Sequence, residues 1–130
     1  VNLMAAIGDP RDFHDPNEVK VVCDTRGYAL YFSREAIPSE KKYGKPVTGY
    51  KQVCIMPFRR DFLFTYTRLP PTPLEIIESV DMLRVLEHGY RIRMVLTDRE
   101  TCSVDTPEDL RYVEGAMKND PLVREYAGIS

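Results

Sequence analysis

The order of the apolar segments constrains the fold of this 130-residue chain more than any other feature. Residues 1–7 form a short apolar run that predicts a β-strand. Residues 19–23 and 28–32 are two further runs, separated by a short turn that ends in Gly27, and this pattern predicts a β-hairpin. Residues 51–58 are mostly apolar and predict another, buried strand. The first half of the chain therefore favours a β-sheet.

Helical patterns dominate the second half. Residues 62–69 predict a short helix that ends at a run of prolines, and residues 91–96 alternate in the manner of a strand. A longer helix is predicted between them by apolar residues at helical spacing, with Gly89 as its C-terminal stop. These residues are Ile76, Ile77, Val80, Leu83 and Leu86. The order of elements predicts the α/β class, with a mixed sheet flanked by helices.

The last helix has the clearest start signal. Residues 106–109, Thr-Pro-Glu-Asp, place a capping hydroxyl at the N-cap, proline at the first helical position and an acid at the third. Leu110, Val113 and Met117 follow at helical spacing and predict a buried stripe.

Two segments predict loops. Residues 8–17 are rich in Asp, Pro and Gly, and residues 38–49 are polar, with three lysines, which is typical of a mobile surface loop. We divide the chain into a portion of residues 1–119 and a C-terminal tail of residues 120–130.

Composition excludes several classes. A hydrophobic content of 43% and a net charge of −2 are ordinary for a globular domain, and no basic stripe supports nucleic-acid binding. The apolar runs are too short for a transmembrane helix, and residues 1–7 lack the charged region of a signal peptide. Cys23, Cys54 and Cys102 have no paired spacing, which favours reduced thiols and a cytoplasmic location over a zinc site.

Two residues are candidates for binding chemistry. Asp105 directly precedes a predicted helix N-terminus, where a phosphate and its Mg²⁺ can be held, although an aspartate before Thr-Pro is also a common turn residue. Arg34 follows a predicted strand, and its planar guanidinium suits a carboxylate or phosphate, although a surface arginine is the simpler explanation. Spacing alone leaves both alternatives open.

Several motifs resemble the CMP-Kdo synthetase family, the 3-deoxy-manno-octulosonate cytidylyltransferases. Residues 15–22, 27–34, 37–38, 70–75, 83–86 with Gly89, and 104–110 carry this similarity. The motifs occur in one order and span nearly the whole chain, from about residue 1 to residue 117.

The resemblance implies the C-terminal half of a nucleotide-diphospho-sugar transferase-like, Rossmann-like fold. It also implies a nucleotidyltransferase that couples CTP to an acidic sugar (Kdo or a related acid), releasing pyrophosphate, for lipopolysaccharide or capsule synthesis. On this resemblance Asp105 helps to bind catalytic Mg²⁺, and Arg34 contacts a substrate carboxylate or phosphate. The resemblance also implies a homodimer, so we expect this protein to form one.

The chain departs from the family pattern in two ways. The N-terminal, nucleotide-binding half is absent, so we expect the chain to be inactive by itself. Gln52, Met56, Asp81 and Met82 stand where the family often carries histidine, tyrosine, glutamate and glutamine around the sugar. These substitutions leave open a different acceptor, such as a small phosphonate acid. The alternative to an enzyme is that the chain is a non-catalytic dimerisation or interaction domain derived from this fold.

Overall fold

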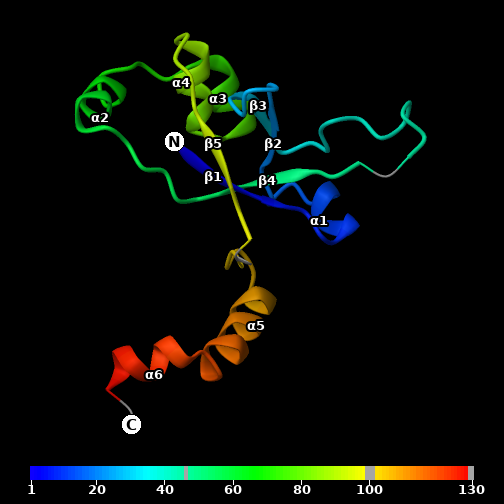
Figure 1. Cartoon of the computed structure of the whole chain (residues 1–130), viewed down its shortest axis with the longest axis vertical. Helices are drawn as coiled ribbons and strands as arrows, with labels where there is room; N and C mark the ends of the chain where they lie inside the picture. Colours follow the sequence, from blue (N-terminus) through cyan, green and yellow to red (C-terminus); the bar gives the residue numbers. More distant parts are fainter. Residues whose placement is uncertain (46, 99–101, 129–130) are drawn as a thin grey trace. The chain divides into compact units, whose positions relative to one another are not determined.

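The computed structural model describes residues 1–45, 47–98 and 102–128 (Figure 1). The chain divides into two compact units, Val1–Arg99 and Glu100–Ser130. The first unit contains the whole sheet, and the second contains two helices.

A five-stranded sheet forms the frame of the first unit. Its strands are β1 (Asn2–Ala6), β2 (Lys20–Cys23), β3 (Ala29–Ser33), β4 (Tyr50–Val53) and β5 (Met94–Thr97), in the spatial order β3-β2-β4-β1-β5. β1 and β5 pair in parallel, whereas the other neighbours pair antiparallel. The predicted mixed sheet and α/β class are therefore confirmed.

The predicted hairpin is β2 and β3, with Lys20 opposite Ser33. Its turn is closed by Asp24, whose carboxylate oxygen Oδ1 accepts the backbone N–H groups of Arg26 and Tyr28, each at 2.9 Å. Gly27 adopts a φ of 76°, a conformation that glycine reaches without steric cost. The local turn chemistry thus produces the hairpin that the sequence indicates.

β4 ends earlier than the sequence predicts. Val53 is buried, but Cys54 and Ile55 are exposed, and no strand continues toward residue 58. The N–H of Ile55 turns back onto the carbonyl of Val53 at 2.7 Å, which interrupts the ladder. The prediction of a buried strand over residues 51–58 is therefore wrong beyond Val53.

The long helix predicted before Gly89 is two helices, α3 (Pro73–Glu78) and α4 (Met82–Glu87). Ser79 lies between them in the left-handed region, with a φ of 54°. The N–H of Val80 bonds the carbonyl of Glu75 at 3.2 Å, a bond that terminates α3. Ile76 and Ile77 consequently lie on an exposed face, at 69% and 77% exposure.

The helix α1 (Pro10–His14) lies inside residues 8–17, so the prediction of a loop there is wrong. Asp9 caps α1 by accepting the N–H of Arg11 at 2.8 Å, and Phe13 is buried. The predicted short helix after residue 60 is confirmed as α2 (Arg60–Tyr66). In the described part of residues 38–49 no helix or strand forms, in agreement with the predicted loop.

The core of the first unit lies between the sheet and α4. Val21 and Phe32 from the sheet are 1% and 0% exposed, and Leu83 and Val85 from α4 are 0% and 1% exposed. Burying a large aliphatic or aromatic side chain contributes about 1.5–3 kcal/mol. These contacts therefore fix α4 against β3, which places α3 and its loop beside the end of the hairpin.

The second unit consists of α5 (Pro107–Lys118) and α6 (Pro121–Ala127). The capping box of Thr106 and Asp109 confirms the predicted start of α5. The predicted buried stripe is wrong, because no residue of α5 is buried and Leu110 and Met117 are about half exposed, since a unit this small offers little to pack on. The helix α6 occupies the predicted tail, and the division at residue 119 stays a prediction.

Candidate functional site

Arg34 lies directly after β3 and is held by three backbone carbonyls. Its Nε donates to the carbonyl of Glu78 at 2.7 Å, one terminal nitrogen donates to Ser79 at 3.1 Å, and the other donates to Pro16 at 2.8 Å. A guanidinium has five N–H donors, so two remain after these three bonds. Arg34 is half-buried, and its role toward a substrate anion stays a prediction.

Glu78 binds the backbone of the same arginine. Its Oε2 accepts the N–H of Arg34 at 2.9 Å, while Oε1 accepts the hydroxyls of Ser33 at 2.9 Å and Tyr31 at 3.1 Å. Burial raises the pKa of the Glu78 carboxyl, but these hydrogen bonds outweigh burial and hold that pKa below its usual value. Glu78 is therefore an anion at neutral pH.

A second cation supports the segment that Arg34 contacts. Lys20 is fully buried, and its ammonium donates to the carbonyls of Asp15 at 2.7 Å and Glu18 at 2.6 Å. Burial lowers the pKa of Lys20. Lys20 and Arg34 together hold residues 15–18 in place beside the hairpin.

Gln52 and Met56 lie close together, with Nε2 of Gln52 3.7 Å from Sδ of Met56. Gln52 is in β4, and Met56 packs against the core cluster that contains Met82. The structure thus brings these two predicted acceptor-site residues into contact.

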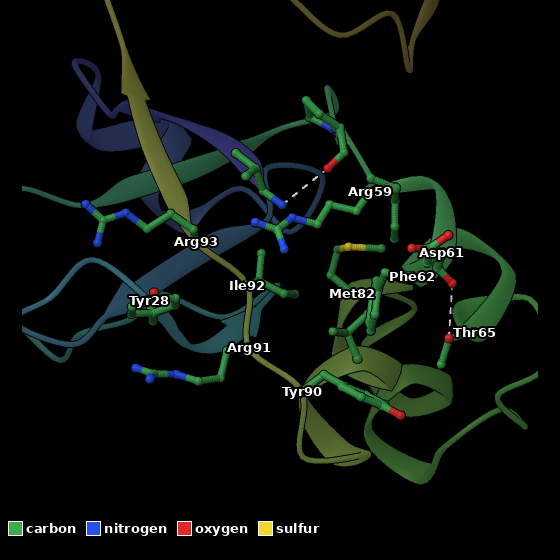
Figure 2. A pocket seen from close by; sticks show the side chains of 14 residues that line it. Tyr28, Arg59, Asp61, Phe62, Thr65, Met82, Tyr90, Arg91, Ile92 and Arg93 are labelled. Atoms are coloured by element: carbon green, nitrogen blue, oxygen red, sulfur yellow. Dashed lines mark hydrogen bonds between the residues drawn. The ribbon is translucent and has the colours of Figure 1, made fainter.

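Met82 lines a cavity of about 620 Å³. Figure 2 shows Met82, Phe62 and Tyr90 on one side of this cavity and Tyr28 with Arg91 on the other. Arg34, Gln52, Met56 and Asp81 do not line it. Met82 is 4% exposed and belongs to the core, whereas Asp81 is exposed at the start of α4.

The cavity is lined by apolar side chains, by three arginines and by one acidic residue, Asp61. Arg91 stacks on the ring of Tyr28, with its guanidinium carbon 3.8 Å from the ring centroid, and it also pairs with Asp24 at 3.2 Å. Arg59 and Arg93 line the same space. Val1 and Arg93, which directly precede β1 and β5, also line this cavity.

Asp105 lies in the second unit, and its side chain is exposed. Its N–H donates to Oδ2 of Asp109 at 3.2 Å, and Oδ2 also accepts from the N–H and the hydroxyl of Thr106 at 2.7 and 2.8 Å. These bonds hold the pKa of the Asp109 carboxyl below its usual value. Asp109 is thus committed to the helix cap, while the carboxylate of Asp105 forms no hydrogen bond within the described residues.

This arrangement fits one carboxylate ligand of Mg²⁺, because that ion takes one or two protein carboxylates and fills its shell with water and phosphate oxygens. Residues 1–45, 47–98 and 102–128 contain no cluster of three His, Cys, Asp or Glu side chains able to hold a metal without a substrate. Among the helices of these same residues, none is long and apolar enough to cross a membrane.

Comparison with known proteins assigns the class. The family model for cytidylyltransferases matches residues 1–92. This match covers most of the chain, and the chain therefore belongs to the cytidylyltransferase family.

Two similar proteins within this family carry the same name. A 3-deoxy-manno-octulosonate cytidylyltransferase of Solibacter usitatus is 47% identical over 116 residues, covering 89% of this chain and 46% of that protein. One from Synechococcus elongatus is 50% identical over 111 residues, covering 82% of this chain and 46% of that protein. The chain thus spans about half the length of the curated relatives it matches.

A solved structure agrees. CMP:2-keto-3-deoxy-manno-octonic acid synthetase complexed with CTP is similar to this chain with a TM-score of 0.80 and 38% sequence identity. The similarity covers 90% of this chain and 48% of that one. The expected resemblance to the CMP-Kdo synthetases is therefore confirmed, as is the fold.

Sequence reasoning missed the roles of three residues. Acidic residues in a helix commonly only complement its dipole, yet Glu75 bonds Arg84, and Glu78 bonds Ser33 and Arg34. Lys20 stands between valines in a strand, and that pattern could have indicated a buried cation.

Proposed function

We propose that this chain supplies the C-terminal portion of a cytidylyltransferase that transfers CMP from CTP to Kdo. The similarity to a CTP-bound synthetase over 90% of the chain carries this proposal. The names of the relatives support Kdo as the acceptor and do not favour a small phosphonate acid. The product would enter lipopolysaccharide or capsule synthesis.

In the proposed reaction the anomeric hydroxyl of the sugar attacks the α-phosphorus of CTP. A new oxygen–phosphorus bond forms, the bond to the β-phosphate breaks, pyrophosphate leaves and the hydroxyl proton passes to solvent. Arg34 holds an anionic group of the acid through its two remaining N–H donors, which orients the attacking hydroxyl. Mg²⁺, held partly by Asp105, would supply positive charge to the phosphates.

We also propose that the protein acts as a homodimer in the cytoplasm. Ile76 and Ile77 on α3 are adjacent, large and exposed, which supports a contact with a second copy through this helix. Cys23, Cys54 and Cys102 are free thiols, which fits a reducing compartment.

A release assay for pyrophosphate tests the function. The chain is incubated with CTP, Mg²⁺ and Kdo, alone and together with the part of the Synechococcus elongatus relative that precedes the matched segment. We expect CMP-Kdo to form in the mixture and little or none with the chain alone. Absence of product from both samples, with the unsplit relative active, would contradict the proposal.

A further inference from the structure

The break between α3 and α4 frees backbone carbonyls for Arg34. In a continuous helix the carbonyls of Glu78 and Ser79 would each accept an N–H four residues later. The left-handed Ser79, with its φ of 54°, interrupts that pattern. Both carbonyls instead accept from the guanidinium of Arg34, at 2.7 and 3.1 Å.

The side chain of Glu78 also binds the backbone of Arg34. Its carboxylate accepts the backbone N–H of Arg34 at 2.9 Å and the hydroxyl of Ser33 at 2.9 Å. One residue therefore contacts both the backbone and the guanidinium of Arg34, which restricts where that side chain can point.

The guanidinium of Arg34 forms no salt bridge with a carboxylate of the described residues, although its charge attracts the nearby Glu78 carboxylate. The three bonds of its guanidinium all go to neutral carbonyls, and none goes to a carboxylate among the described residues. Because a guanidinium keeps its charge at every accessible pH, the two remaining N–H donors are suited to an anion from outside the chain.

We infer that Glu78, together with the left-handed turn at Ser79, is a positioning element that aims Arg34 at the carboxylate of the acid substrate. The inference rests on the proposed function, since it names the group that Arg34 binds. Glu78 does not touch the substrate but acts through Arg34.

The matched control is Glu87. Its carboxylate also accepts backbone N–H groups in the same helical layer, from Leu74 at 3.1 Å and Glu75 at 3.2 Å, but it does not contact Arg34. Loss of either carboxylate therefore removes bonds to backbone N–H groups, and only loss of Glu78 removes the bond that fixes the backbone of Arg34.

In the two-part enzyme described above, Glu78→Ala should raise the KM for Kdo by about tenfold or more and leave the KM for CTP within about twofold. Glu78→Gln should recover part of this loss, because its amide oxygen can still accept the N–H of Arg34. Glu87→Ala should lower the thermal stability but should not raise the KM for Kdo relative to the KM for CTP. Equal changes in both KM values for Glu78→Ala, or no change in either, would overturn the inference.

Nuclear magnetic resonance of the chain alone separates this inference from the proposed function. The Nε–H signal of Arg34 should shift in a saturable manner when Kdo is added to the natural chain and to Glu87→Ala, and should respond at least severalfold more weakly in Glu78→Ala. The positioning role would be refuted if the chemical shift of this signal did not change with Kdo in the natural chain, or if it changed equally in all three proteins. This holds whether or not turnover is found.

Discussion

The carboxylate of Glu75 in α3 and the guanidinium of Arg84 in α4 form a two-bonded ion pair. Nε of Arg84 donates to Oε2 at 2.7 Å, and the second bond joins the terminal nitrogen of Arg84 to Oε1. Glu75 is buried, and Arg84 also lies over the ring of Tyr66, with its guanidinium carbon 5.2 Å from the centroid. The pair therefore ties together the two helices on either side of Ser79.

Glu75→Ala should lower the free energy of unfolding by about 2–3 kcal/mol, because it leaves the arginine without its partner in a largely buried position. Urea denaturation followed by circular dichroism measures this change. Glu114→Ala, which removes an exposed carboxylate of α5, should lie within about 0.5 kcal/mol of the natural chain. Similar losses in both variants would show that the pair is not a special contact.

Stability should fall in acid through the same pair. The hydrogen bond from Arg84 holds the pKa of Glu75 below its ordinary value of 4.5. Because the folded-state pKa is lowered, the contribution of Glu75 is fully present above about pH 4.5 and is lost as the pH falls through the lower, folded-state pKa. Glu75→Gln should therefore flatten the fall in unfolding free energy from about pH 5 to about pH 3, as measured by denaturation at each pH. An equally steep fall in both proteins would mean that other carboxylates dominate.

Local signals in the sequence were sufficient to predict the hairpin turn and the start of α5. Gly27 and Asp24 close the hairpin turn within a segment of five residues. Thr106 starts α5 by accepting the N–H of Asp109, three residues later. Arg34 was recognised as a candidate because it follows a strand. Its anchors could not be predicted, because Glu78 lies 44 residues away along the chain.

Two of the wrong predictions share a physical cause. The spacing of Ile76, Val80 and Leu83 is helical, but contacts across the fold favour a left-handed Ser79 over one more helical turn. Helical spacing also predicted a buried stripe in α5, but no residue of α5 is buried in its own unit. Periodicity shows which face is apolar, and it does not show what that face packs against.

The conformation of Ser79 makes a prediction about stability. A φ of 54° costs an L-residue with a branched side chain more than it costs serine, and glycine least. Thermal denaturation should therefore rank the proteins Ser79→Gly, natural chain and Ser79→Val in falling order, with Ser79→Val lower by about 1–2 kcal/mol. Ser39, which has no positive φ, should show no such ranking when changed in the same ways.

Ile77→Lys should weaken self-association. The side chain is 77% exposed and adjoins Ile76, so a charge at this position would be buried in the proposed dimer. We expect the dissociation constant to rise by about thirtyfold or more, which light scattering coupled to gel filtration measures as a shift toward the mass of one chain. Leu30→Lys changes a residue of similar exposure on β3 and is the control. An equal effect of both changes, or a natural chain that is monomeric at every concentration, would rule out α3 as the contact.

Asp105 and Asp109 allow the metal role to be separated from the helix cap. Asp105→Asn removes a carboxylate that forms no hydrogen bond in the described residues, so it should lower turnover in the two-part enzyme by about 100-fold and raise the Mg²⁺ concentration that is needed. Asp109→Asn weakens bonds to Thr106 at 2.7 and 2.8 Å, so it should lower the stability of the helix start by about 0.5–1 kcal/mol while the Mg²⁺ requirement is unchanged. Turnover measured against Mg²⁺ concentration, with helix content followed by circular dichroism, distinguishes the two effects. If Asp109→Asn altered the Mg²⁺ requirement and Asp105→Asn did not, the ligand would be Asp109 and the assignment would be reversed.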